Sequence, residues 1–93
     1  MQLSLQTIEL AHNRINPYII NTPIKSNEEI SHSVGSDIYF KCENLQNSGS
    51  FKFRGASNAV FSLNDEEAHR GVITVSSGNH GTALSLAAKN RGI

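Results

Sequence analysis

In the first segment of the chain, four mostly apolar residues recur near the helical period of about 3.6 residues, which predicts a helix over residues 3–15. The Asn16-Pro17 pair ends this helix because proline cannot continue it. The next residues, 18–22, are expected to be extended, since Thr22 precedes a second proline. The residues that recur at helical spacing are Leu5, Ile8, His12 and Ile15.

Two short runs of β-branched and aromatic residues predict strands at residues 37–43 and 72–75. A helical pattern follows each run, and this order of strand and then helix is typical of α/β folds with a parallel sheet. Because two parallel strands rarely stand alone, further strands are expected outside these residues.

Polar residues mark where the remaining helices begin and end. Ser50 is the expected N-cap of a helix over residues 51–63. A final helix is expected from about residue 79, with Gly92 after its last turn. Two capping boxes predict further short helices. These boxes pair Ser26 with Glu29 and Asn64 with Glu67.

The composition narrows the classes of function. Eight basic and eight acidic residues give the 93-residue chain a formal charge of zero, so no binding surface for nucleic acid or anionic membranes is expected. No apolar run reaches the length of a membrane span, and the first residues do not resemble a signal peptide, so a cytoplasmic location is expected. The histidines and the single cysteine, Cys42, lack the spacing of a metal site.

The first run with candidate chemistry is Asn47-Ser-Gly-Ser-Phe-Lys-Phe-Arg-Gly-Ala56, which places Lys52 at a predicted helix start. A lysine in an apolar setting can form an imine with an aldehyde. Phe51 and Phe53 are expected to provide apolar cover, and Arg54 a nearby positive charge. Taken alone, however, a lysine in the first turn of a helix is more often a solvated side chain.

The second run is Ser76-Ser-Gly-Asn-His-Gly81, at the predicted start of the last helix. Asn79 can donate to a negatively charged oxygen there, and it can equally be an N-cap. Ser77 is either a proton carrier assisted by its surroundings or a hydrogen-bonding turn serine. His80 is expected to be structural, with a hydrogen bond near the helix start.

Together the two runs resemble those of pyridoxal-phosphate (PLP) enzymes with the tryptophan synthase β fold, in particular the serine/threonine dehydratase and serine racemase group. The match covers the S-F-K-x-R-G-A and S-S-G-N-H-G motifs residue by residue, although Thr82 replaces the usual glutamine. The resemblance implies an α/β fold, part of a three-layer αβα architecture that is truncated after the first β-α unit of the small domain. Residues 1–66 would belong to the large domain, and residues 67–93 would begin the small one.

The resemblance also implies roles for individual residues. Lys52 would carry PLP, with Phe51 beside the cofactor and Asn79 in contact with its 3′-oxygen. Lys52 would take the α-proton of an L-amino acid, and Ser77 would serve the opposite face, as in serine racemases. The loop that binds the PLP phosphate and the divalent-cation ligands of the family are expected outside this chain.

The function implied is that of a PLP-dependent ammonia-lyase or serine racemase, with L-serine or L-threonine as substrate and a homo-oligomeric full-length parent. The family's enzymes are several times longer, so the 93-residue chain alone is expected to be inactive. Two alternatives stay open. One is a fragment of a cysteine synthase-like β-replacement enzyme, and the other is a remnant without catalytic activity.

Overall fold

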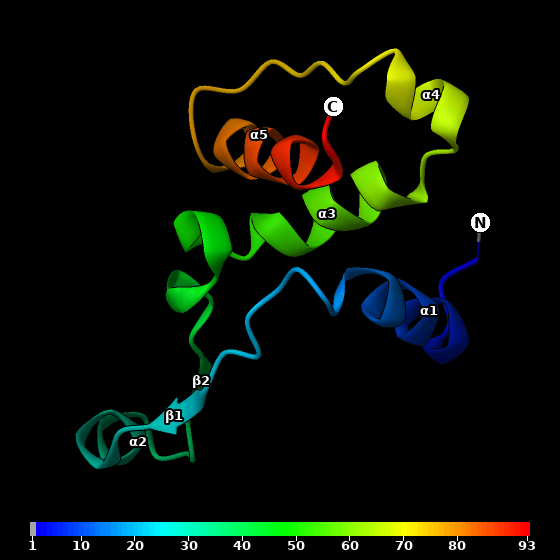
Figure 1. Cartoon of the computed structure of the whole chain (residues 1–93). Coiled ribbons are helices and arrows are strands. Elements are labelled where there is room, and N and C mark those ends of the chain that lie inside the picture. The colour runs from blue at the N-terminus through cyan, green and yellow to red at the C-terminus, as the bar shows by residue number, and fades with distance from the viewer. Residues whose placement is uncertain (1) are drawn as a thin grey trace.

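The computed structural model describes residues 2–93 and consists of helices with one small sheet (Figure 1). A long helix pair occupies one end of the molecule, and the sheet with one short helix extends from it, giving overall dimensions of 53 × 32 × 22 Å. In chain order the elements are α1 (Leu5–Ile15), β1 (Ile24–Ser26), α2 (Glu28–Val34), β2 (Tyr39–Lys41), the 3₁₀ turns η1 (Glu43–Leu45) and η2 (Asn47–Gly49), α3 (Lys52–Ser62), α4 (Asp65–His69) and α5 (Asn79–Arg91).

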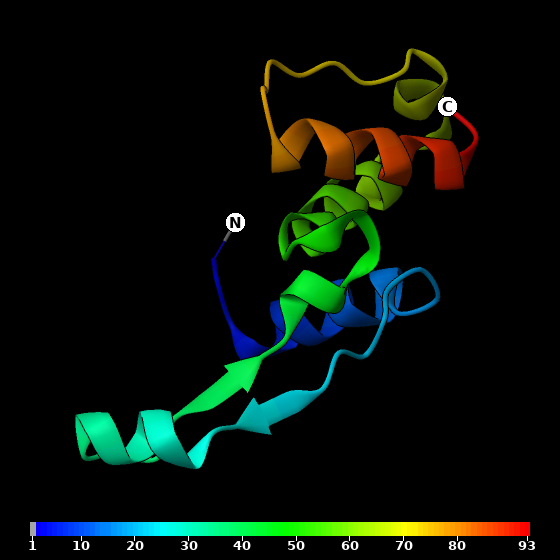
Figure 2. The ribbon, with the colours of Figure 1, turned by 90° about the vertical axis from the view of Figure 1, so that its left-hand side faces the viewer.

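The core lies between α3 and α5, which run side by side in both ribbon views (Figures 1 and 2). Most core positions are alanines, and small side chains let the two helix backbones approach closely. Phe53 is the largest side chain in this core and is completely buried. The core residues are Phe53, Ala56, Val60, Ala83 and Ala87.

The predicted first helix is confirmed, with its start at Leu5 behind a capping box of Ser4 and Thr7. It packs against α3, and Arg14 Nη1 donates a hydrogen bond of 2.6 Å to Asn58 Oδ1. Ile15 is the buried residue of α1. The chain after the helix also covers α3, because the ring of Tyr18 stacks on Phe61 with centroids 4.0 Å apart.

The parallel sheet expected of the fold is not formed within residues 2–93, where the described sheet is antiparallel. β1 and β2 pair in antiparallel fashion, with Ile24 opposite Lys41 and Ser26 opposite Tyr39. The sequence pattern missed β1 because it is only three residues long and exposed at every position, so it carries no alternation of buried apolar and exposed polar positions. The intervening helix α2 begins one residue later than its predicted capping box, since its N-cap is Asn27.

The predicted strand at residues 72–75 is also wrong, because this segment has no regular structure and pairs with no other strand in the described chain. Ile73 and Val75 are 95% and 99% exposed. A strand exists only through its ladder partners, and residues 2–93 provide none for this segment.

The predicted start of α4 and the predicted end of α5 are confirmed. The capping box of Asn64 and Glu67 is present at the start of α4, and Gly92 ends α5 with a left-handed φ of 80°. The predicted domain boundary between residues 66 and 67 falls inside α4 and stays a prediction, and α3 and α5 on either side share one core. None of the described helices is long and apolar enough to cross a membrane.

Candidate functional site

Lys52 is the first residue of α3, and its side chain is exposed. The buried Ser50 accepts a hydrogen bond from the Lys52 N–H at 3.3 Å, so it acts near the helix start as predicted, although the N-cap itself is Phe51. Lys52 Nζ lies 5.3 Å from the ring centroid of Phe51 and has no hydrogen-bond or ion-pair partner within residues 2–93. No group of the described chain therefore holds this amine in place.

The expected apolar setting of Lys52 is only partly present. Phe53 is completely buried in the core between α3 and α5, so it cannot cover a side chain that faces solvent. Phe51 does lie beside the amine, but it is itself 63% exposed. In this chain the lysine thus has one aromatic neighbour and open solvent around it.

The turn that leads to Lys52 has an unusual backbone. Ser48 has φ 66° and ψ −2°, and Gly49 follows with φ 82°, so two consecutive residues are left-handed. The conformation costs a residue with a side chain roughly 1–2 kcal/mol, whereas glycine adopts it freely. The Ser48 hydroxyl is also buried without a hydrogen-bond partner in the described chain. Such strain persists only where the surrounding contacts hold the turn in place.

Arg54 does not act as a free charge near Lys52, because its guanidinium forms an ion pair with Glu43 in η1. Arg54 Nη2 donates to Glu43 Oε2 at 3.1 Å, Arg54 Nε donates to Oε1, and Thr22 Oγ1 donates to Oε2 at 2.6 Å. These hydrogen bonds, above all that of Arg54, lower the pKa of Glu43 from 4.5 to about 2 against the opposing effect of burial. The carboxylate therefore stays ionised well into the acidic range.

The second motif forms a turn that is held by Ser76. Its Oγ accepts hydrogen bonds from Gly78 N–H at 3.2 Å and from Gly81 N–H at 3.0 Å. A Cβ on Gly81 would come within 3.3 Å of Ser76 Cβ, so this close contact favours glycine. The sequence pattern did not single out Ser76, although the repeated serine before a glycine turn was the available signal.

Ser77 and Asn79 are both exposed, and no hydrogen bond is found for either side chain in the described part of the chain. The alternative of Asn79 as an N-cap is wrong, because the N-cap of α5 is Gly78 and Asn79 is the first helical residue. His80 is exposed and lacks the expected hydrogen bond within residues 2–93. The side chains of Ser77 and Asn79 are therefore both available to a ligand.

A hollow of about 450 Å³ lies beside this turn. Lys52 does not line it, so the structure does not join the two motifs in one cavity. It does bring their elements together, since η2 and α3 both contact α5 and the two helices begin on the same side of the pair (Figures 1 and 2). The residues that line the hollow are Thr74, Ser76, Ser77, Gly78, Gly81, Thr82 and Ser85.

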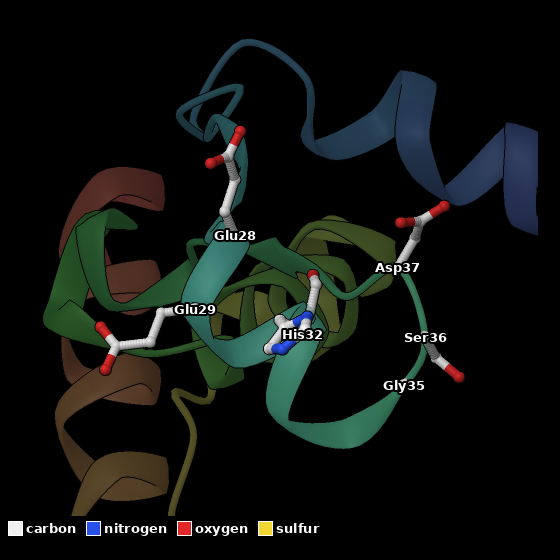
Figure 3. A pocket seen from close by; sticks show the side chains of 7 residues that line it. Glu28, Glu29, His32, Gly35, Ser36 and Asp37 are labelled. Carbon is white, nitrogen blue, oxygen red and sulfur yellow. The ribbon is translucent and has the colours of Figure 1, made fainter.

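Another hollow lies around α2, far from the helix pair, and is lined by acidic residues, His32 and the turn after the helix (Figure 3). The side chains of Glu28 and Glu29 point in different directions there, so they do not converge on a common point. Among residues 2–93, no group of three or more His, Cys, Asp or Glu side chains is placed to hold a metal ion.

Comparison with known proteins identifies relatives of the whole described chain. Residues 15–93 match the family model of pyridoxal-phosphate dependent enzymes. A serine racemase of Dictyostelium discoideum is 56% identical over 89 residues, which cover 96% of this chain and 28% of that protein. A beta-hydroxyaspartate dehydratase of Paracoccus denitrificans is 53% identical over 83 residues, covering 89% of this chain and 26% of that protein.

A solved structure of maize serine racemase superimposes with a TM-score of 0.94 at 48% identity, covering all of this chain and 29% of that one. The predicted α/β fold of the tryptophan synthase β type is confirmed by this likeness. The chain spans little more than a quarter of the length of these relatives. With its family model and its fold in agreement, the chain belongs to the family of pyridoxal-phosphate-dependent enzymes.

Proposed function

We propose that this chain carries the cofactor lysine of a PLP-dependent racemase or ammonia-lyase that acts on small hydroxy amino acids such as serine and threonine. The observation that carries the proposal is the placement of the two motifs. Lys52 begins α3 with a free amine, and α3 packs against the helix that begins with Asn79. The names of the relatives, which include serine racemases and a beta-hydroxyaspartate dehydratase, support both activities.

The groups present fit PLP. A lysine amine without a partner in the described chain is the group that holds the PLP aldehyde, and Phe51 beside it offers an aromatic face. Asn79 offers an unused amide at a helix N-terminus, where the helix dipole favours a negative oxygen. PLP, when bound, stabilises negative charge at the substrate α-carbon. Its phosphate site is proposed to lie outside these residues.

The residues of this chain would then hold and move protons. Lys52 would accept the α-proton of an L-amino acid through its amine. Ser77 would serve the opposite face. The hydrogen bonds of the turn support this role. Ser76 makes the structural ones, and the Ser77 hydroxyl has no partner within the described residues.

The two activities can be separated in a chimera in which the remaining segment of the Dictyostelium serine racemase follows this chain. Ser77→Ala should abolish racemisation and the turnover of D-serine, while ammonia release from L-serine largely survives. Lys52→Ala should abolish ammonia release from L-serine. The matched control is Ser85→Ala, which changes another exposed serine of the same hollow and should leave both reactions intact.

If Ser77→Ala leaves the turnover of D-serine unchanged, Ser77 is a turn residue only and the function reduces to that of a dehydratase. A cysteine synthase-like enzyme predicts a different outcome, namely replacement of the β-substituent by sulfide without racemisation. A remnant without catalytic activity predicts that the chimera neither racemises serine nor releases ammonia even when it is fully folded.

A further inference from the structure

The carboxylate of Glu43 lies where three segments of the chain meet. It accepts hydrogen bonds from Arg54 in α3 and from Thr22 in the segment before β1. Thr22 is 3% exposed, and the side chains of Arg54 and Glu43 are 29% and 15% exposed. This is a partly buried ion pair with satisfied oxygens, in which the loss of either partner leaves a charge without compensation.

The residues that follow Glu43 reinforce the same junction. The Gln46 side chain acts like a peptide group, since its Oε1 accepts from Ile20 N–H at 2.8 Å and its Nε2 donates to the Ile20 carbonyl at 2.8 Å. Asn47 Nδ2 donates to the Tyr18 carbonyl at 2.8 Å. We call these side chains the polar clamp, which consists of Thr22, Glu43, Gln46, Asn47 and Arg54.

The polar clamp fixes both ends of the segment that contains Lys52. Glu43 and Arg54 are joined across a loop that includes η2 and the left-handed Ser48, and this loop also contacts α5 (Figure 2). A closed loop has fewer conformations than an open one, so the ion pair restricts where the intervening residues can lie. Arg54 donates from two nitrogens to the two oxygens of Glu43, and this pairing fixes the relative orientation of the side chains in a way that a lysine cannot reproduce.

We propose that Glu43 and Arg54 are positioning residues that hold Lys52 at a set place relative to the turn of Ser77 and Asn79. They act through the backbone of η2 and the first turn of α3. The part of this inference that concerns PLP rests on the proposed function, whereas the part that concerns the backbone does not. The two parts can be tested in one set of variants.

The test uses Glu43→Gln and Arg54→Lys in this chain, with Glu66→Gln as the matched control. Glu66 also forms an ion pair, with Arg70 at 2.6 Å, but that pair is exposed and lies in α4. One readout is hydrogen exchange of residues 47–54, followed by mass spectrometry. The other is the share of PLP label that borohydride fixes on Lys52, with the remaining lysines of the same molecule as internal standards.

Both clamp variants should speed exchange at residues 47–54 about tenfold, the factor that corresponds to one charge-assisted hydrogen bond. Helix content by circular dichroism should not change, and exchange in the interior of α5 should rise by a smaller factor than exchange at residues 47–54. The share of PLP label found on Lys52 should fall in both variants by a similar factor. Arg54→Lys should lower this share although the new lysine keeps the positive charge. Glu66→Gln should match the wild type in both readouts.

Unchanged exchange in both variants would overturn the inference. Faster exchange at residues 47–54 with an unchanged share of PLP label on Lys52 would overturn the part of the inference that concerns PLP. Equal labelling of all lysines in the wild type contradicts the proposed function instead, and exchange alone then decides the positioning role. If Glu43→Gln unfolds the chain, Thr22→Val removes a single bond of 2.6 Å to the same carboxylate and is read by the same criteria.

Discussion

The Glu43–Arg54 pair makes a quantitative prediction about stability and pH. Its hydrogen bonds lower the pKa of Glu43 from 4.5 to about 2, and one pKa unit corresponds to about 1.4 kcal/mol. The carboxylate therefore contributes at most about 3 kcal/mol to the free energy of unfolding, and because the pair is only partly buried, screening by solvent reduces this to about 1–2 kcal/mol. Because the folded pKa is the lower one, the contribution is complete above pH 4.5 and is lost as the pH falls toward 2.

Glu43→Gln removes this contribution and leaves Arg54 without its anion. The free energy of unfolding should fall by about 1–2 kcal/mol at pH 7. The difference between wild type and variant should shrink as the pH falls from 4.5 to 2, since the Glu43 carboxylate that the variant lacks becomes protonated in the wild type. Urea unfolding of the chimera with the Dictyostelium segment, followed by circular dichroism at several pH values, measures this difference.

Glu66→Gln is again the control, because its ion pair with Arg70 is exposed and should contribute less than about 1 kcal/mol. A difference between wild type and Glu43→Gln that is independent of pH between 2 and 7 would refute the reasoning. So would a Glu43 carboxyl that titrates near 4.5 in a ¹³C NMR experiment on the folded chain.

Two further predictions concern the chain as a folding unit. Ile73 and Val75 are almost fully exposed, and their backbone pairs with no strand in the described chain. The isolated 93-residue polypeptide should therefore be marginally stable or self-associate. A single cooperative melt of a species that size-exclusion chromatography shows to be a monomer would contradict this. In the chimera, Gly55→Ala has open space in a helix and should stabilise by about 0.5–1 kcal/mol, whereas Gly81→Ala should stabilise less, because its Cβ would lie 3.3 Å from Ser76 Cβ; thermal unfolding compares the two variants.

Features that depend on neighbouring residues could be predicted from the sequence. The capping box of Asn64 and Glu67 and the glycine end of α5 at Gly92 were both predicted correctly, because their hydrogen bonds join residues a few positions apart. The two motifs likewise identified the family, since their letters are contiguous. Chemistry at Lys52 and Ser77 stays a prediction.

Features that depend on distant residues could not be predicted. The antiparallel pairing of β1 with β2 joins Ile24 to Lys41, and neither short strand has an alternating pattern that would reveal a partner. The partner of Arg54 was also missed, because Glu43 was interpreted only as the end of a strand. A motif arginine just after a buried position was the available signal that a carboxylate should lie nearby.

The central claim is that Lys52 holds PLP, and site-specific labelling tests it most directly. The chain is incubated with PLP, reduced with borohydride and digested, and the modified lysines are quantified by mass spectrometry. Lys41 is a useful internal comparison, because its amine already donates to the Thr22 carbonyl at 2.6 Å. The account predicts that label accumulates on Lys52 ahead of Lys25, Lys41 and Lys89. Equal labelling of all four lysines in a chain that retains its helices would contradict it.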